Sequence, residues 1–298
     1  MGHRSSIGFS CAVKLIVLSW VLVNFAIKPV IANPFAEQTL RVAFHAQSFP
    51  ELSKEDLEIS VKMLSVELGR DIAVATEVAL YDDVGIMRRD FEQGKVNFVV
   101  VSTMLLATEF NTQLFADGFR LVKSDAQDHL VIVVQKGIGT SQLKDFYGKR
   151  LVLSTQDPIT DLYIDYLAWS NFKKSYKSSF KQMPREKKAQ QLVLKLFFDQ
   201  ADITCVYRHV LQIAAELNPQ LRDKVEIIEQ LDGIPSAVGL FHKNVPITFR
   251  EQVIDKALQL ASTPRGQQML ELFRSDKAIR STPEDLIQAK KLLALYES

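Results

Sequence analysis

Residues 96–101 read "VNFVVV", a run that is apolar at every position except Asn97. A β-branched run without polar alternation is typical of a strand that is buried on both faces of its sheet. Strands are also expected over residues 39–45 and 72–80, and a helix-like segment follows each of them. The order strand, helix, strand, helix, strand predicts right-handed crossovers onto a largely parallel sheet.

Capping residues mark the helices between these strands. Ser53, with Asp56 three residues later, has the spacing of a capping box. Asp82 or Asp83 is expected to cap the next helix, which should end at Gly94.

The same alternation begins again in the second half of the chain. Since no flexible linker separates the two α/β units, we expect two lobes joined by extended segments. The expected strands cover residues 129–134, 150–154, 202–207 and 237–242, and the expected helices cover residues 158–170 and 185–198.

The end of the chain is expected to be helical, with no strand after residue 242. Three helix starts are expected there: Thr248 with Glu251 as a capping box, Thr263-Pro264, and Thr282-Pro283 with Asp285 behind it.

The first 32 residues have the composition of a secretory signal peptide. A short basic leader precedes an apolar stretch over residues 15–27, and small residues at 30–32 suit signal peptidase. The alternative is a membrane anchor, but a span needs about 20 apolar residues. We therefore expect cleavage near residue 32 and a periplasmic protein.

Composition argues against several classes of function. Without Arg4, Lys14 and Lys28 of the leader, 33 of the 36 basic residues remain against 35 acidic ones, a net charge of −2. Nucleic-acid-binding proteins usually carry a basic excess, so no nucleic acid is expected as a partner. The mature chain keeps one cysteine, and its histidines show no metal-ligand spacing, so we expect neither a disulfide nor a metal or other cofactor.

Polar side chains follow the predicted strands at their carboxyl ends, which is where α/β sheets bind ligands. Hydroxyl groups and backbone amides at a helix start can hold an anion, because the first N–H groups of a helix have no partner within it. The residues in question are His45, Gln47 and Ser48, then Tyr81, Asp82 and Asp83, then Ser102 and Thr103, then Thr155, Gln156, Asp157 and Thr160, and finally Arg208 and His209.

Several of these residues have a purely structural alternative. Asp157 and Pro158 can simply begin a helix, with Thr160 in its first turn. Cys205 and His209 are four residues apart, a spacing that would suit a nucleophile and base on one helix. Cys205 is instead expected in a strand as a small core residue, so we expect no catalysis.

Five blocks of sequence have a recognisable order along the chain: "LRVAFHAQSFPE" (40–51), "LYDDVGIMRRDFEQGKVNFVVVST" (80–103), "LKDFYGKRLVLSTQDPITDLYIDYL" (143–167), "FFDQADITCVYRHVL" (197–211) and "AVGLFHKNVPITFREQVIDKALQLASTPRGQQML" (237–270). In this order they resemble the periplasmic phosphate/phosphite/phosphonate-binding proteins that serve ABC importers. The resemblance implies a type II periplasmic-binding-protein fold, an α/β architecture of two lobes, each a mostly parallel sheet flanked by helices, joined by a two-segment hinge.

The expected boundaries follow from this resemblance. Residues 33–125 and 236–298 would form lobe one, residues 126–235 would form lobe two, and the hinge would lie at 124–130 and 231–236.

The resemblance also implies roles for single residues. Tyr81 matches an aromatic residue that faces the ligand, Ser102 and Thr103 match a loop at the ligand, and Thr160 matches a hydroxyl at the helix start that holds the anion.

The chain departs from the family pattern in three places. Asp161 replaces a small neutral residue, and its carboxylate would repel an anion about 4 Å away by roughly 1 kcal/mol even in water-like surroundings. Asn97 stands where an aspartate is common. Arg208 and His209 replace acidic residues, so Arg208 would reject an amino group and could act as a counter-charge to an anion.

We therefore expect a monomeric solute-binding protein that captures a small phosphate- or phosphonate-like anion and delivers it to the permease of an ABC importer. One alternative is a sensory subunit that engages a membrane signalling receptor, and a less favoured one is an enzyme on the same scaffold. The expected ligand-binding residues are Tyr81, Ser102, Thr103, Thr155, Thr160, Arg208, Gln47 and His45.

Overall fold

The structure is a computed structural model that describes residues 39–49, 52–70, 72–123, 128–138, 142–155 and 157–297. The predicted signal peptide, Gln156 and residues 124–127 of the predicted hinge lie outside these residues.

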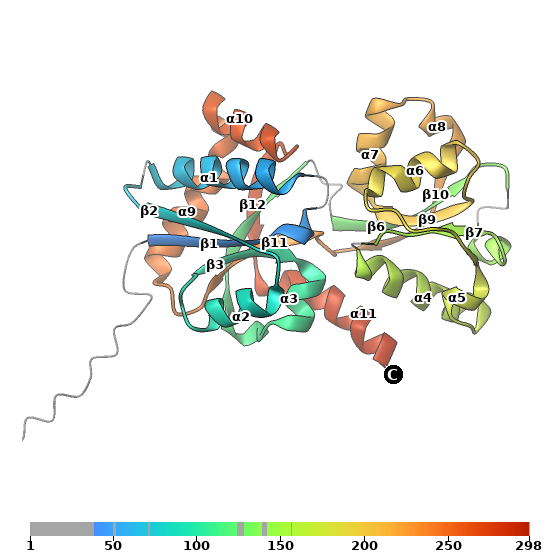
Figure 1. The fold of residues 1–298 in the computed structure, drawn as a ribbon, viewed down its shortest axis with the longest axis horizontal. Helices are drawn as coiled ribbons and strands as arrows, with labels where there is room; N and C mark the ends of the chain where they lie inside the picture. The colour runs from blue at the N-terminus through green and yellow to red at the C-terminus, as the bar shows by residue number, and fades with distance from the viewer. Residues whose placement is uncertain are drawn as a thin grey trace, which may run out of the picture. The chain divides into compact units, whose positions relative to one another are not determined.

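The first sheet contains the strand formed by the apolar run near residues 96–101, and its strand order is β2-β1-β3-β11-β4 (Figure 1). β1 pairs in parallel with β2 and β3, whereas β11 pairs antiparallel with β3 and β4. Val99 and Val101 in β3 are fully buried, as expected for an interior strand. The strands are β1 (Thr39–His45), β2 (Ala75–Tyr81), β3 (Phe98–Ser102), β4 (Phe115–Ala116) and β11 (Ala237–His242).

Helices follow the strands of the first sheet as the alternation predicts. Asp56 N donates to Ser53 Oγ over 3.1 Å, and Ile86 N donates to Asp83 Oδ1 over 2.9 Å, which confirms both helix starts. The second of these helices ends earlier than expected, at Glu92. The elements are η1 (Ala46–Ser48), α1 (Lys54–Arg70), α2 (Val84–Glu92), α3 (Thr103–Glu109) and η2 (Thr112–Leu114).

The second sheet has the order β10-β6-β9-β7-β8. β7 is parallel to β8 and β9, whereas β6 is antiparallel to β9 and β10, so both sheets are mixed. The strands are β6 (His129–Gln135), β7 (Arg150–Val152), β8 (Lys181–Gln182), β9 (Ile203–Tyr207) and β10 (Val225–Asp232). The helices are η4 (Leu143–Phe146), α4 (Pro158–Phe172), α5 (Tyr176–Ser179), α6 (Ala189–Phe197), α7 (Arg208–Leu217) and α8 (Leu221–Lys224).

The prediction that no strand follows residue 242 is wrong. β12 (Lys277–Ser281) pairs antiparallel with β5 (Gly118–Val122) in a separate two-stranded sheet. Its sequence, "KAIRS", is too short and polar to stand out, and only the partner strand shows that it is extended.

The C-terminal helix starts are partly confirmed. Thr263 caps α10 (Pro264–Leu272), and Thr282 forms a capping box before η6 (Pro283–Leu286), which leads into α11 (Ile287–Glu297). The expected capping box of Thr248 and Glu251 is wrong, because α9 (Ile247–Leu258) starts after Pro246 and Glu251 pairs with Arg280 instead. A further turn, η5 (Leu260–Ser262), joins α9 to α10.

Two glycines allow β5 to lie against β11. A Cβ at Gly118 would lie 2.2 Å from Gly239 O, and a Cβ at Gly239 would lie 2.4 Å from Phe119 O. Both distances are far below van der Waals contact, so only glycine fits at these two positions. The close approach places Arg120 of β5 beside the first sheet.

Two hydrophobic clusters pack against the first sheet, one of which includes β5 and β12, and a third packs against the second sheet. The core of the second sheet also contains Ala289 and Leu292, so α11 at the end of the chain packs there. Among the described residues, no helix has the length and apolarity needed to cross a membrane.

Candidate ligand-binding cavity

A cavity of about 670 Å³ lies at the carboxyl ends of strands from both main sheets. It is lined by the last residues of three strands, namely His45 of β1, Ser102 of β3 and Tyr207 of β9, and by Thr155 in the loop after β7. This is the edge at which open α/β sheets bind ligands.

On the first-sheet side, hydrogen bonds hold two serine hydroxyls in place. Ser48 Oγ accepts from Ser102 N over 3.0 Å and is bonded to His45 Nδ1 over 3.0 Å. Ser102 Oγ accepts from Leu105 N over 3.4 Å, because Ser102 is the N-cap of α3. Burial lowers the pKa of His45, so the imidazole is neutral at pH 7. This side therefore presents neutral polar groups, together with the carboxylates of Asp82, which pairs with Lys54, and Asp83, which caps α2.

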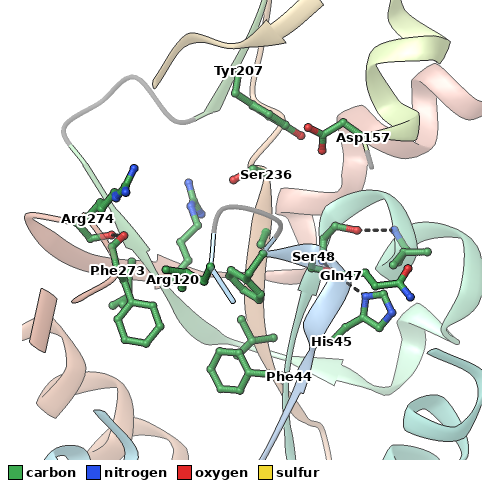
Figure 2. A pocket seen from close by; sticks show the side chains of 18 of the residues that line it. Phe44, His45, Gln47, Ser48, Arg120, Asp157, Tyr207, Ser236, Phe273 and Arg274 are labelled. Atoms are coloured by element: carbon green, nitrogen blue, oxygen red, sulfur yellow. Dashed lines mark hydrogen bonds between the residues drawn. The ribbon is translucent and has the colours of Figure 1, made fainter. Parts of the chain in front are cut away.

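On the second-sheet side, Tyr207, His209 and Asp157 line the cavity. The Tyr207 ring stacks on His209 at 5.7 Å, and Figure 2 shows its hydroxyl beside the Asp157 carboxylate. Burial, followed by the charge of Asp157, raises the pKa of Tyr207 well above its usual value. Burial also lowers the pKa of His209 to about 4, and its Nδ1 is buried without a hydrogen-bond partner in the described part of the chain. Asp157 is therefore the charged group on this side.

Two arginines line the cavity, but they differ in their ion pairs. Arg120 donates to both Asp128 and Asp285, the latter over 2.9 Å, so carboxylates already offset its charge. Arg274 is exposed and forms no ion pair within the residues that the structure describes. Figure 2 shows both guanidinium groups extending toward the side of Tyr207. Arg274 is thus the cation best placed to attract an anionic ligand.

Four of the eight residues predicted to bind ligand line this cavity: His45, Gln47, Ser102 and Thr155. Gln47 is exposed, and Thr155 N and Oγ1 donate to Glu186 O over 2.9 and 3.4 Å. Their roles toward a ligand stay predictions.

The other four predicted residues are not among those that line it. Tyr81 Oη donates to Asp90 Oδ2 over 3.0 Å, and Thr160 Oγ1 donates to Asp157 O over 2.7 Å. The Thr103 hydroxyl donates to Pro235 O, and Thr103 is fully buried.

Arg208, the fourth, begins α7 between two residues that do line the cavity. The charge of Arg208 contributes to lowering the pKa of Asp232. The contacts described for these four side chains are therefore with other protein groups.

The departures from the family pattern have structural explanations. Asp161 forms an ion pair with Arg185 and accepts from Tyr176 Oη over 2.5 Å, so its charge is compensated. Asp161 lines a separate cavity of about 300 Å³, not the larger one. The structure therefore gives no support to repulsion by Asp161 of an anion in the larger cavity.

Asn97 supports the sheet instead of the site. Its side chain accepts from Arg41 N over 2.9 Å and donates to Thr39 O over 2.7 Å. Neither Asn97 nor Thr39 is among the residues that line the cavity.

The prediction that Cys205 is a core residue of a strand is confirmed. Cys205 lies in β9 and is fully buried, whereas His209 belongs to α7, so the two do not share a helix face. Burial raises the pKa of the thiol well above its usual value. Within the described ranges, no cluster of three or more histidine, cysteine or acidic side chains could hold a metal ion.

Sequence reasoning missed Arg120, Arg274 and Ser236, all of which line the cavity. Ser236 is the last residue of the predicted crossing segment 231–236, so that segment was a usable signal. No signal in the sequence pointed to the two arginines. Arg120 lies in β5 and Arg274 lies in the turn between α10 and β12, and neither β5 nor β12 was recognised as a strand.

Comparisons with known proteins agree on one fold. A family model described as the ABC transporter, phosphonate, periplasmic substrate-binding protein matches residues 43–286. PhnD1 from Prochlorococcus marinus, solved in complex with methylphosphonate, aligns with 89% of this chain and 99% of its own at 14% identity, with a TM-score of 0.63. A Xanthomonas citri protein solved bound to ATP aligns with 88% of this chain and 98% of its own at 13% identity, with a TM-score of 0.60.

A binding-protein component of an ABC phosphonate transporter from Pseudomonas aeruginosa is also similar. It aligns with 88% of this chain and 87% of its own at 11% identity, with a TM-score of 0.59. At such identities the likeness to solved structures establishes the fold alone. Among curated proteins, none matches the sequence.

Proposed function

The chain belongs to the ABC-transporter family of periplasmic phosphonate substrate-binding proteins, and on this premise we propose that it captures a small phosphate- or phosphonate-like anion for an ABC importer. Members of this family are binding components of transporters, and the type II fold expected from the sequence agrees with that role. The periplasm is the compartment of the family, and the signal-peptide-like residues 1–32 support export.

The observation that carries the proposal is the cavity of about 670 Å³ at the carboxyl ends of β1, β3, β7 and β9. The hydroxyl groups of Ser102 and Ser236 can each donate a hydrogen bond to an anion, whereas those of Ser48 and Thr155 are already bonded to His45 and to Glu186 O. Neutral donors of this kind bind an anion reversibly, as a transporter component requires.

We further propose that residues 33–125 and 236–298 form one lobe and residues 126–235 the other. The crossing segments are bonded to each other, because Ile234 N donates to Asp128 O over 3.0 Å. Thr103 N also donates to Ser236 O over 3.2 Å, which ties the second segment to the first sheet. In this proposal α11 reaches from the first lobe into the core of the second through Ala289 and Leu292. Closure of such a hinge would present a surface to the permease.

A binding panel tests the function. Isothermal titration of the mature protein with phosphate, phosphite, methylphosphonate and acetate is expected to give saturable binding for at least one phosphorus anion. Trp169 on α4 is exposed and is the only tryptophan outside the predicted signal peptide, so its emission gives a second readout. No binding of any phosphorus anion by either readout would contradict the proposal.

Opposite charge changes at two cavity residues test the sign of the ligand's charge. Asp157→Asn is expected to strengthen binding of a phosphorus anion, and Arg274→Gln is expected to weaken it. A unit charge at 4 Å contributes about 1 kcal/mol in water-like surroundings, which corresponds to roughly a fivefold change in Kd for each variant. The measurement is titration with the anion that binds best in the panel.

Arg222→Gln and Asp223→Asn provide the matched controls, because both residues are exposed on α8 outside the cavity. The controls should leave the Kd unchanged. Weaker binding after Asp157→Asn would instead indicate a ligand with a positive group beside that carboxylate.

A further inference from the structure

Part of the cavity wall is apolar, and its chemistry differs from that of the serine-rich side. We call Phe44, Phe49, Val100, Leu121 and Phe273 the apolar floor; all five line the cavity. They come from β1, the segment after η1, β3, β5 and the turn after α10. Figure 2 shows the rings of Phe44 and Phe273 on the side of the cavity opposite Tyr207 and Asp157.

The side chains of the apolar floor are less buried than their position in the sheet would lead us to expect. Val100 lies in β3, which has neighbours on both sides, and the adjacent Val99 and Val101 are fully buried. Val100 is only partly buried, as are Leu121 and Phe273, although all three pack against the core of the first sheet. Protein interiors are close-packed, so apolar side chains at the centre of a sheet normally have packing partners. Val100, Leu121 and Phe273 instead face the cavity.

The cavity also has a larger volume than an inorganic anion would fill. A water molecule occupies about 30 Å³ in the liquid, so about 670 Å³ corresponds to roughly 20 water molecules. A phosphate ion has five heavy atoms and would occupy only the polar side. Water left against the apolar floor would find few hydrogen-bond partners there.

We propose that the solute is an organic anion with an apolar substituent of several carbon atoms. Its charged group binds at the polar side, near Ser48, Ser102, Ser236 and Arg274, and its substituent lies against the apolar floor. This inference rests on the proposed function and specifies the class of substrate. Displacing poorly held water from apolar walls favours such a ligand over the bare anion.

A series of n-alkylphosphonates tests the inference by titration calorimetry. Each methylene that enters the apolar region is expected to tighten binding roughly fourfold. Butylphosphonate should therefore bind roughly 60-fold more tightly than methylphosphonate. Butanol, which lacks the charged group, should bind more weakly than butylphosphonate.

Two substitutions test whether the substituent lies against the apolar floor. Phe273→Ser is expected to reduce the advantage of butyl over methyl about tenfold, because it removes the buried contact area of one ring. Val100→Leu adds bulk to the floor and should reduce the same ratio without adding a polar group. The matched control is Leu272→Ser, since Leu272 precedes Phe273, is exposed and does not line the cavity. Melting temperatures of the unliganded variants establish that each one is folded.

The outcomes separate this inference from the function on which it rests. If methylphosphonate binds but affinity does not rise with chain length, the apolar-substituent proposal is overturned and the binding function stands. If phosphate or phosphite binds but no phosphonate does, the apolar-substituent proposal fails and the binding function stands; if no phosphorus anion binds, both fail. If both floor variants keep the full chain-length dependence, or if butanol binds as tightly as butylphosphonate, the assignment of the two regions is wrong.

Discussion

Replacing Arg120 with methionine is expected to lower the free energy of unfolding by about 3 kcal/mol. The Arg120 side chain is only 8% exposed and pairs with Asp128 and Asp285, whose side chains are 30% and 24% exposed. Removing the arginine leaves two partly buried carboxylates without their cation. Burial already raises the pKa of Asp285, and Arg120 opposes that rise, so the carboxylate loses stabilisation in the variant. Urea unfolding of the unliganded protein measures the change.

Arg280→Met is the matched control for this prediction. Arg280 lies in β12, which pairs with the strand of Arg120, and it also bonds two carboxylates, Asp117 and Glu251. Its side chain is 35% exposed and those of Asp117 and Glu251 are 40% and 39% exposed, so solvent screens these pairs and a smaller loss of about 1 kcal/mol is expected. Equal losses in the two variants would show that burial does not govern the strength of these pairs.

The second large effect is expected from Gly239→Ala, which should lower the free energy of unfolding by at least about 3 kcal/mol. The added Cβ would lie 2.4 Å from Phe119 O and 2.5 Å from the Phe98 ring. Neither neighbour can yield easily, because one is backbone and the other is a buried ring stacked on Phe119 at 4.9 Å. β5 would have to move away from β11, and the cavity wall contributed by β5 would move with it. Urea unfolding, or a loss of soluble protein, measures the effect.

Gly85→Ala in the first turn of α2 is the control. There the Cβ would meet only Asp83 Oδ1 at 3.1 Å and Arg89 Nη1 at 3.9 Å, both at the ends of flexible side chains. Alanine is favoured over glycine in a helix by about 1 kcal/mol, so this variant should be neutral or slightly more stable. A loss in Gly85→Ala as large as in Gly239→Ala would contradict the steric explanation.

Local patterns in the sequence were sufficient for the strands and helices that carry strong signals. The run at 96–101 predicted β3, the apolar segments at 39–45 and 237–242 predicted β1 and β11 with their observed bounds, and the caps at Ser53 and Thr263 were confirmed. These signals involve neighbours along the chain, so no knowledge of the fold was needed.

The strands β5, β10 and β12 required the tertiary structure. Their sequences are short or partly polar, and each becomes extended because a partner strand supplies its hydrogen bonds. The same reason explains why Arg120 and Arg274 were missed, since one lies in β5 and the other directly before β12.

By itself, the sequence determined the α/β class, the family and the strand-exit positions of His45, Gln47, Ser102 and Thr155 at the cavity. Only the tertiary structure decided that Tyr81 and Thr160 bond within their own segments, that Asp161 is compensated by Arg185, and that Phe44 and Phe273 of the apolar floor lie opposite Tyr207 and Asp157. The physical reason is range: strand and helix signals act between residues close in the chain, whereas a cavity is formed by side chains that only the packed sheets bring together.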